Sequence, residues 1–151
     1  MNIRKFNESD LMNLHGTLSD PDVMKYIEPI FNLEKTKEFI NSVAISDSPL
    51  IYAAEDDKGN YIGYVIYHDY EDNSIELGWI LNKREWGKGY ASKLTELMIE
   101  KAATEGKDAI IECSPLQSAT IHIAEKYGFV YEGQDDNCNI YRLNQHLSHT
   151  N

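Results

Sequence analysis

The sequence predicts a single α/β domain (in the wider sense that includes α+β) built on a mixed, mostly antiparallel sheet. Its 151 residues are enough for one hydrophobic core and too few for two domains. Its 42% hydrophobic and 26% charged residues are typical of globular proteins. Short β-prone runs alternate with amphipathic segments, and there is no repeat or linker. We therefore expect one domain over residues 1–144 and a polar tail over 145–151.

The first half of the chain predicts four strands and two helices. A polar run at residues 7–10 is typical of a helix cap, and apolar residues at helical spacing follow it. A second helix is expected where Phe39, Ile40 and Val43 share one face. Polar turns separate the last three strands. The expected strands are 2–6, 50–54, 61–70 and 74–81, and the expected helices are 11–18 and 32–46.

The second half predicts two further helices and three strands. Leu94, Leu97 and Met98 recur on one face of the longest helix, and Gly106 can end it. Gly128 ends the second of these helices. Together with the first half, this makes a sheet of about seven strands flanked by about four helices. The expected helices are 88–103 and 118–127, and the expected strands are 109–113, 129–132 and 140–143.

Composition excludes several classes of partner and site. The chain carries 14 basic and 25 acidic residues, a net charge of −11, which repels nucleic acid and anionic lipids and favours small cations or basic peptides. No apolar run approaches the roughly 20 residues of a membrane span, and no signal segment is recognisable, so we expect a cytoplasmic protein. Cys113 and Cys138 have no disulfide or metal spacing, and no metal is expected.

One segment, residues 83–93, reverses the charge of the chain. It holds four basic residues with Glu85 as its one acid, and two glycines precede the longest helix. Glycines let the backbone approach a ligand, and a helix start offers unpaired N–H groups to an anion. A solvated glycine turn is the other interpretation. No nucleoside triphosphate loop is present, and a dinucleotide fingerprint would need Gly or Ala where Ser92 stands.

Two motifs carry a resemblance to a known family. Arg84-x-x-Gly87-x-Gly89, which follows the strand ending at Leu81, resembles the pyrophosphate loop of the GNAT superfamily of acyl-CoA N-acyltransferases. Residues 117–129 resemble the second signature of that family. They are closest to the branch that acetylates ribosomal-protein N-termini and polyamines. The resemblance implies a GNAT-like fold with a central, splayed parallel pair of strands, 74–81 and 109–113.

The resemblance implies acetyl-CoA as cosubstrate and no metal. Main-chain N–H groups from Trp86 to Ala91 would bind the pyrophosphate, and the end of the preceding strand would pair with the pantetheine arm. Gln117 stands where the family often has Asn. The implied cofactor-binding residues are Ile80, Leu81, Arg84, Trp86, Gly87, Lys88, Gly89, Tyr90, Ala91 and Gln117.

Acetyl transfer to an amine needs a base for the ammonium and a proton for the departing thiolate. Glu76 and Glu112 match strand glutamates that serve as bases in the family, and solvent-facing positions are the alternative for both. Many members carry a tyrosine where this chain has Ala124. Tyr127, beside Gly128, is the candidate substitute, and packing in the core is the other interpretation of it.

The resemblance therefore implies an N-acetyltransferase that acts by direct attack in a ternary complex. The acceptor would be a primary amine: a protein or peptide N-terminus, a polyamine or another small amine. A non-catalytic acyl-CoA-binding regulatory module is the alternative, suggested by Ala124. Transfer of a longer acyl group is a third hypothesis. Homodimers are common in the family, so the resemblance also admits a homodimer.

Overall fold

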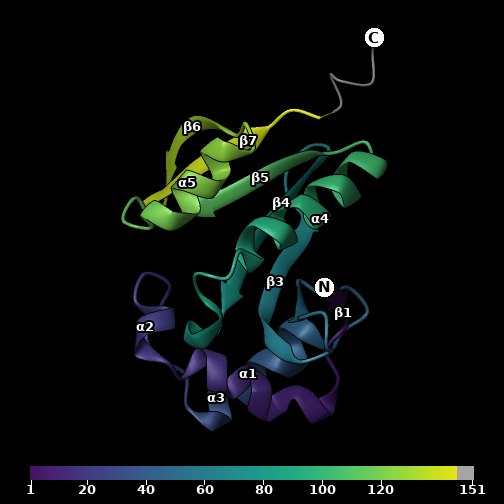
Figure 1. The fold of residues 1–151 in the computed structure, drawn as a ribbon, viewed down its shortest axis with the longest axis vertical. Helices are drawn as coiled ribbons and strands as arrows, with labels where there is room; N and C mark the ends of the chain where they lie inside the picture. The colour runs from purple at the N-terminus through teal and green to yellow at the C-terminus, as the bar shows by residue number, and fades with distance from the viewer. Residues whose placement is uncertain (146–151) are drawn as a thin grey trace. The chain divides into compact units, whose positions relative to one another are not determined.

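The computed structural model describes residues 1–145, and in this part of the chain seven strands form one mixed sheet in the order β1-β2-β3-β4-β5-β7-β6 (Figure 1). The predicted fold class is confirmed. Strands β4 and β5 pair in parallel, with residues 74–76 opposite 108–110, and both strands continue beyond this short ladder. The pairs β1–β2, β2–β3, β5–β7 and β6–β7 are antiparallel.

The strands agree with the prediction to within a few residues. The run predicted at 74–81 has the predicted bounds, because polar turns flank it on both sides. The last hairpin is longer than expected, since Asp136 and Asn137 adopt positive φ and make a tight turn. The strands are β1 Asn2–Arg4, β2 Ile51–Glu55, β3 Tyr61–Asp69, β4 Ser74–Leu81, β5 Asp108–Cys113, β6 Val130–Asp135 and β7 Cys138–Leu143.

Residues 1–145 contain five α-helices, one more than the predicted four. The additional helix, α2, is a single turn, too short to show a helical period in the sequence, although Asp20 caps it and Pro21 opens it. The segment predicted as one helix over 32–46 is α3 followed by a π-helical turn, η2. The helices are α1 Leu11–Leu18, α2 Pro21–Met24, α3 Leu33–Phe39, η2 Ile40–Ala44, α4 Tyr90–Thr104 and α5 Ser118–Lys126, with short turns η1 Glu8–Asp10 and η3 Lys83–Glu85.

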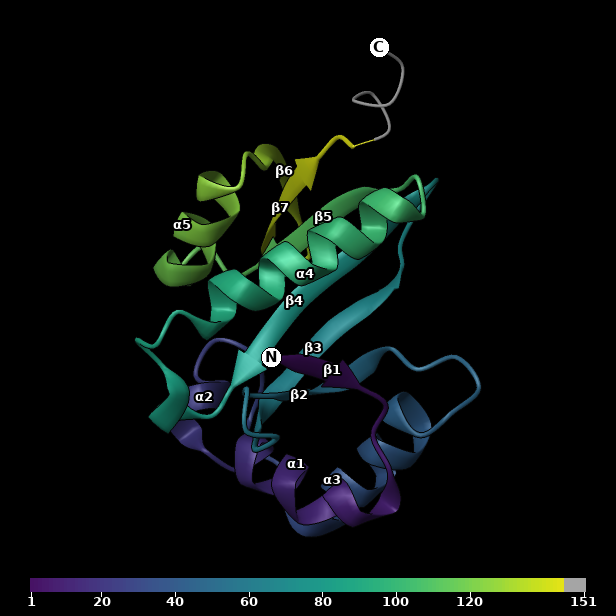
Figure 2. The ribbon, with the colours of Figure 1, turned by 45° about the vertical axis from the view of Figure 1, so that its right-hand side comes forward.

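The chain forms two compact units. The first unit comprises residues 1–66 and 79–90, and the second comprises residues 67–78 and the described residues from 91 onward. In the first unit, α1 and α3 lie side by side (Figure 2). Their apolar faces and those of β2 and β3 enclose one core, whose central side chains include Leu14, Leu18, Phe31, Ile40, Ile51 and Tyr64.

The second unit packs α4 and α5 with β5 and β7. Leu94, Met98 and Ala102 lie on the buried face of α4, as their spacing predicts, whereas Leu97, expected on the same face, is 39% exposed. Strand β5 is buried along most of its length, which fits a strand with paired neighbours on both sides. Figure 1 shows α5 beside β5, and the two elements are in contact.

Gly63 brings β3 unusually close to the end of β4. Its φ is +148°, and a Cβ atom there would lie 2.3 Å from the carbonyl oxygen of Ile80 and 2.7 Å from the Cα of Leu81. A side chain of any size is therefore excluded at this position. The contact lies within the first unit and fixes the strand end from which the glycine loop departs.

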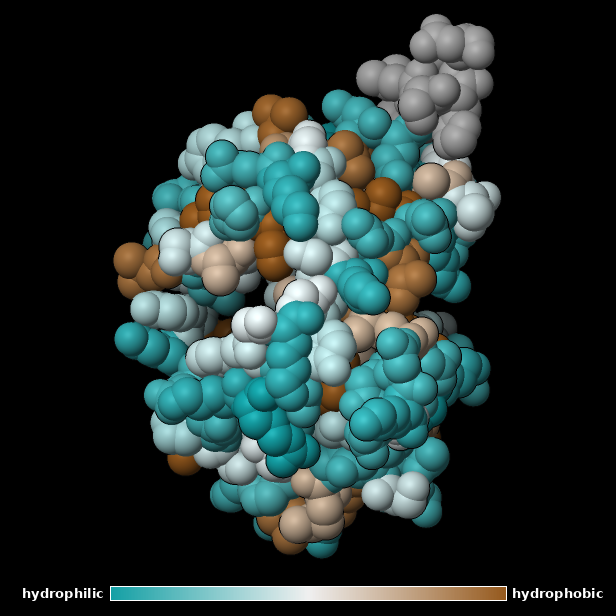
Figure 3. Space-filling view, viewed as in Figure 1, coloured by the Kyte–Doolittle hydropathy of each residue, from teal (hydrophilic) through white to brown (hydrophobic). Residues whose placement is uncertain are grey.

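The surface is mostly hydrophilic on the face seen in Figure 3, with apolar side chains scattered between polar ones. Within residues 1–145, no helix is long and apolar enough to cross a membrane. Both cysteines are free. Gln145 is buried, and its N–H group donates to Asp108 Oδ1 at 2.8 Å. The remainder of the predicted tail, 146–151, lies outside the described residues.

Candidate functional site

The glycine loop connects β4 to α4 through η3 and lies in the first unit. Gly87 and Gly89 have φ values of +77° and +82°, which L-residues with a side chain rarely adopt. A Cβ atom at either glycine would meet open space. The N–H groups of Gly87, Lys88 and Gly89 donate to no acceptor within residues 1–145. The loop therefore presents unpaired main-chain donors where a ligand has room to approach.

The basic side chains of this loop are not free charges. Buried Glu85 lies 3.4 Å from Arg84 Nε and 3.2 Å from Lys88 Nζ, and Lys83 Nζ donates to Asp22 Oδ2 at 2.6 Å. The expected local excess of positive charge is thus reduced by ion pairs that sequence spacing did not reveal. The Arg84 and Lys88 side chains are 76% and 51% exposed, so an anionic ligand can reach both of them and compete with Glu85.

Trp86 is bonded to the loop itself. Its N–H group donates to the Lys83 carbonyl, and its indole Nε1 donates to the Leu81 carbonyl, each at 3.1 Å. Because the Trp86 N–H group already has an acceptor, the predicted main-chain donors to the pyrophosphate are reduced to the N–H groups of Gly87 and the residues after it. Those donors fit an anionic diphosphate.

A second set of polar side chains gathers on one face of β3, β4 and β5. We call His68, Tyr70, Glu76 and Glu112 the carboxylate cluster; all four lie in the second unit. The Tyr70 hydroxyl donates to Glu112 Oε1 at 2.6 Å, and His68 Nε2 lies 3.5 Å from Glu76 Oε1. Glu112 therefore accepts a hydrogen bond from a neutral phenol, and Glu76 lies beside an imidazole.

Burial and charge raise the proton affinity of the carboxylate cluster. The Glu76 side chain is 19% exposed. Its burial raises the pKa of the carboxyl group, the charge of Glu112 raises it further, and His68 acts in the opposite direction. The hydrogen bond to Glu112 raises the pKa of Tyr70, so this phenol stays protonated. Glu76 is thus suited to accept a proton from a substrate.

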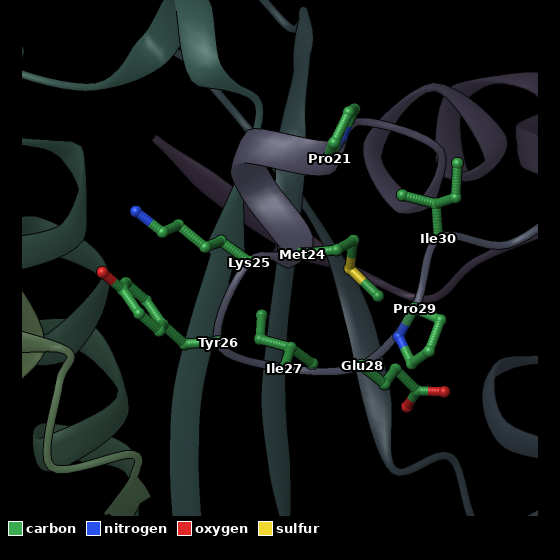
Figure 4. Close-up of a pocket in the computed structure, with 8 residues that line it drawn as sticks. All are labelled: Pro21, Met24, Lys25, Tyr26, Ile27, Glu28, Pro29 and Ile30. Atoms are coloured by element: carbon green, nitrogen blue, oxygen red, sulfur yellow. The ribbon is translucent and has the colours of Figure 1, made fainter.

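The structure also contains a pocket of about 570 Å³ in the first unit. Mostly apolar side chains line it, and Lys25 and Tyr26 extend to the same side of it (Figure 4). The Glu28 carboxylate is paired with Lys35 Nζ at 3.2 Å. The lining residues of the pocket are Pro21, Met24, Lys25, Tyr26, Ile27, Glu28, Pro29 and Ile30.

Comparison with known proteins agrees with the fold. The model of the acetyltransferase (GNAT) domain family matches residues 1–130. The chain belongs to the GNAT acetyltransferases. It is 29% identical over 140 residues to an uncharacterized N-acetyltransferase, YnaD of Bacillus subtilis, a match that covers 90% of this chain and 82% of that protein. GNAT acetyltransferases use acetyl-CoA as acetyl donor, so the suspected superfamily and the predicted enzyme class are confirmed.

Solved structures share this GNAT fold. A GNAT family acetyltransferase from Bacillus anthracis superimposes with a TM-score of 0.79 at 27% identity, over 93% of this chain and 92% of the other. A spermidine N-acetyltransferase from Vibrio cholerae, in complex with CoA and spermine, superimposes with a TM-score of 0.77 at 22% identity, over the same shares of 93% and 92%. Within residues 1–145, no group of side chains could hold a metal ion.

Two residues assigned from the GNAT signatures have local partners. The Tyr127 hydroxyl donates to Glu96 Oε1 at 3.0 Å and lies 3.3 Å from the Ser92 carbonyl, and burial raises its pKa. Gln117 Oε1 accepts from the Ser114 N–H group at 2.9 Å. Their roles as proton donor and cofactor ligand stay predictions.

Sequence reasoning missed His68 and Tyr70. The turn between β3 and β4 could have located them. The Tyr70 N–H group donates to the Ser74 carbonyl, and this bond sets the register of the two strands. Counting outward from this turn places His68 opposite Glu76. The position of Glu112 follows from the parallel ladder, where Glu76 faces Ile110, two residues earlier on β5.

Proposed function

We propose that this GNAT acetyltransferase acetylates the primary amine of a basic acceptor and that Glu76 is its general base. The acceptor classes are a polyamine, another small amine, or a peptide or protein N-terminus. The observation that carries the proposal is the half-buried Glu76 carboxylate, which lies 3.5 Å from His68 Nε2 and whose pKa is raised by burial and by the charge of Glu112. An alkyl ammonium has a pKa near about 10 and reacts as a nucleophile after it loses a proton.

The residues divide into a binding set and a proton-handling set. Main-chain N–H groups from Gly87 to Ala91 bind the diphosphate, and acetyl-CoA supplies the acetyl group as a reactive thioester. Glu76 accepts the ammonium proton, directly or through one water molecule, and His68 holds the carboxylate in place. Glu112, held by Tyr70, adds the negative charge that attracts an ammonium and keeps Glu76 basic.

Charge supports a basic acceptor. The chain has a net charge of −11, which raises the local concentration of cations. The similar Vibrio cholerae enzyme was crystallised with spermine, which makes polyamines the first acceptors to test. An N-terminal peptide also carries a primary amine and is the second class to test.

The test measures release of CoA thiol from acetyl-CoA with spermidine, a monoamine and a short peptide as acceptors. We expect turnover with at least one basic amine. Glu76→Gln should lower kcat by roughly 10²–10⁴-fold, the usual contribution of a general base, without changing CoA affinity. Glu100→Gln, at an exposed position of α4, is the matched control and should keep wild-type activity. Full activity of Glu76→Gln would remove Glu76 from the reaction.

A binding-only module is the competing function, and one observation motivates it. Ala124 is fully buried in α5, so it supplies no hydroxyl to protonate a thiolate. Family membership favours the enzyme. Tight binding of acetyl-CoA without thiol release on any amine would favour the module, and faster turnover of a longer acyl-CoA would favour a different acyl donor.

A further inference from the structure

Asn82 stands at the cap position of η3 without capping it. Asparagine is among the preferred residues at such positions, because its side-chain oxygen accepts from the N–H groups of the first turn. Within residues 1–145, the Asn82 side chain makes no such bond to the N–H groups of η3. Its Oδ1 atom instead accepts from the Thr17 hydroxyl at 2.7 Å. A favourable local bond has been replaced by a contact with α1, 65 residues away in sequence.

A chain of hydrogen bonds fixes this contact. Thr17 is fully buried, and its hydroxyl carries one proton, for which Asn82 Oδ1 at 2.7 Å is a closer acceptor than the Asn13 carbonyl at 3.3 Å. The same oxygen then accepts from the Tyr61 hydroxyl at 2.8 Å. Burial raises the pKa of Tyr61, so this phenol remains a donor. The order Tyr61 to Thr17 to Asn82 gives each of the two hydroxyl protons an acceptor, and all three residues lie in the first unit.

The main chain of Asn82 is fixed as well. Its N–H group donates to the Ile62 carbonyl at 2.9 Å, and its carbonyl accepts from the Glu85 N–H group at 2.9 Å. Asn82 is therefore the joint at which β4 ends and the glycine loop begins. These main-chain bonds do not restrain the Asn82 side chain, whereas the hydrogen bond from Thr17 does.

We propose that Thr17 is a positioning residue for the cofactor loop. Its hydroxyl holds Asn82 away from the N–H groups of η3 and so sets the direction in which the main chain enters the segment 87–89. Without that hydroxyl, the Asn82 side chain is free to cap the turn, which gives the loop competing conformations. This inference rests on the proposed role of the loop in binding acetyl-CoA.

The experiment compares Thr17→Val with the wild type. Valine keeps the shape of threonine and removes the hydroxyl. The dissociation constant of CoA, measured by calorimetry, and the KM for acetyl-CoA should both rise about fivefold, the effect of losing one buried hydrogen bond. The kcat at saturating acetyl-CoA and the KM for the amine should stay within twofold. Thr17→Ser keeps the hydroxyl and should restore wild-type CoA affinity.

Thr36→Val is the matched control. Thr36 is also fully buried in the first unit, and its hydroxyl donates to the Asn32 carbonyl at 2.9 Å, with no bond to the loop. The Thr36→Val variant should lose thermal stability to a similar extent as Thr17→Val, but its affinity for CoA should equal that of the wild type. Half-buried Asn82→Ala provides a second variant: it removes the bond that anchors the start of the loop to α1, and it should also lower CoA affinity.

The outcomes separate this inference from the proposed function. A wild-type chain that binds no CoA would overturn both. A wild type that binds CoA, together with Thr17→Val and Asn82→Ala variants of unchanged affinity, would overturn the positioning role alone. An equal loss of affinity in Thr36→Val would also overturn it, because the effect would then follow general stability.

Discussion

As the proposed general base, Glu76 should set the acid limit of the pH range in which the enzyme is active. A general base works in its deprotonated form, so kcat/KM falls as pH decreases through its pKa. Because burial and the charge of Glu112 raise that pKa, the fall should begin above the ordinary glutamate value of 4.5. In Glu112→Gln the repulsion is lost, the pKa of Glu76 decreases, and the acid limb of the pH–kcat/KM profile should move to lower pH.

Glu100→Gln again serves as the control, and its acid limb should coincide with that of the wild type. A Glu112→Gln profile that moves to higher pH would mean that another group controls the limb. The side-chain amide introduced by Glu112→Gln can still accept from Tyr70, so the variant changes charge more than structure.

Single residues also show where sequence reasoning stops. Glu76 and Glu112 could be nominated because a family signature places them on known strands. The ion-pair partners of the basic residues in the loop could not be predicted. Asp22 binds Lys83 from 61 residues away in sequence, and no rule of spacing predicts that contact. The Thr17–Asn82 bond could not be predicted either. The sequence around Asn82 has the pattern of a helix cap, but the Asn82 side chain bonds to Thr17 instead of capping the turn.

At the scale of elements, Gly63 controls how closely β3 approaches β4. Gly63→Ala would place a methyl group 2.3 Å from the Ile80 carbonyl oxygen at a φ of +148°. Overpacking and backbone strain should together lower the free energy of unfolding by about 3 kcal/mol or more. Urea unfolding measures this change.

The matched control is Gly16→Ala, at an exposed position in α1 where a Cβ atom meets open space. Alanine is the better helix former, so this variant should gain about 0.5–1 kcal/mol. If the two substitutions had similar effects on stability, the proposed close approach of the strands would be wrong.

Elements were predictable where a period runs long enough to be read. Strand β4 alternates over eight residues between polar turns, and its bounds were predicted. Helix α2 covers four residues, fewer than a helical period needs, and it was missed. The π-helical turn η2 shares its apolar pattern with an ordinary helix, so its Ile45-to-Ile40 hydrogen bond appears only in the structure.

At the scale of the whole molecule, net charge acts on the two substrates in opposite directions. The chain carries −11, acetyl-CoA is an anion, and the proposed acceptor is a cation. The Debye length is about 30 Å at 0.01 M salt and about 8 Å at 0.15 M, so added salt screens attraction and repulsion alike. The basic side chains of the loop attract acetyl-CoA at short range, whereas the net negative charge of the whole chain acts over longer distances.

Raising the salt concentration between these two values should therefore increase the KM of a polyamine acceptor several-fold and leave the KM of acetyl-CoA unchanged or lower. A monoamine acceptor should respond less, because it carries less charge. Steady-state kinetics at each salt concentration measures both constants, with circular dichroism to confirm that the fold is unaffected. A loss of stability would impair both substrates together, so KM values that rise in parallel would count against steering of a cationic acceptor and leave the carboxylate cluster as the sole source of its recognition.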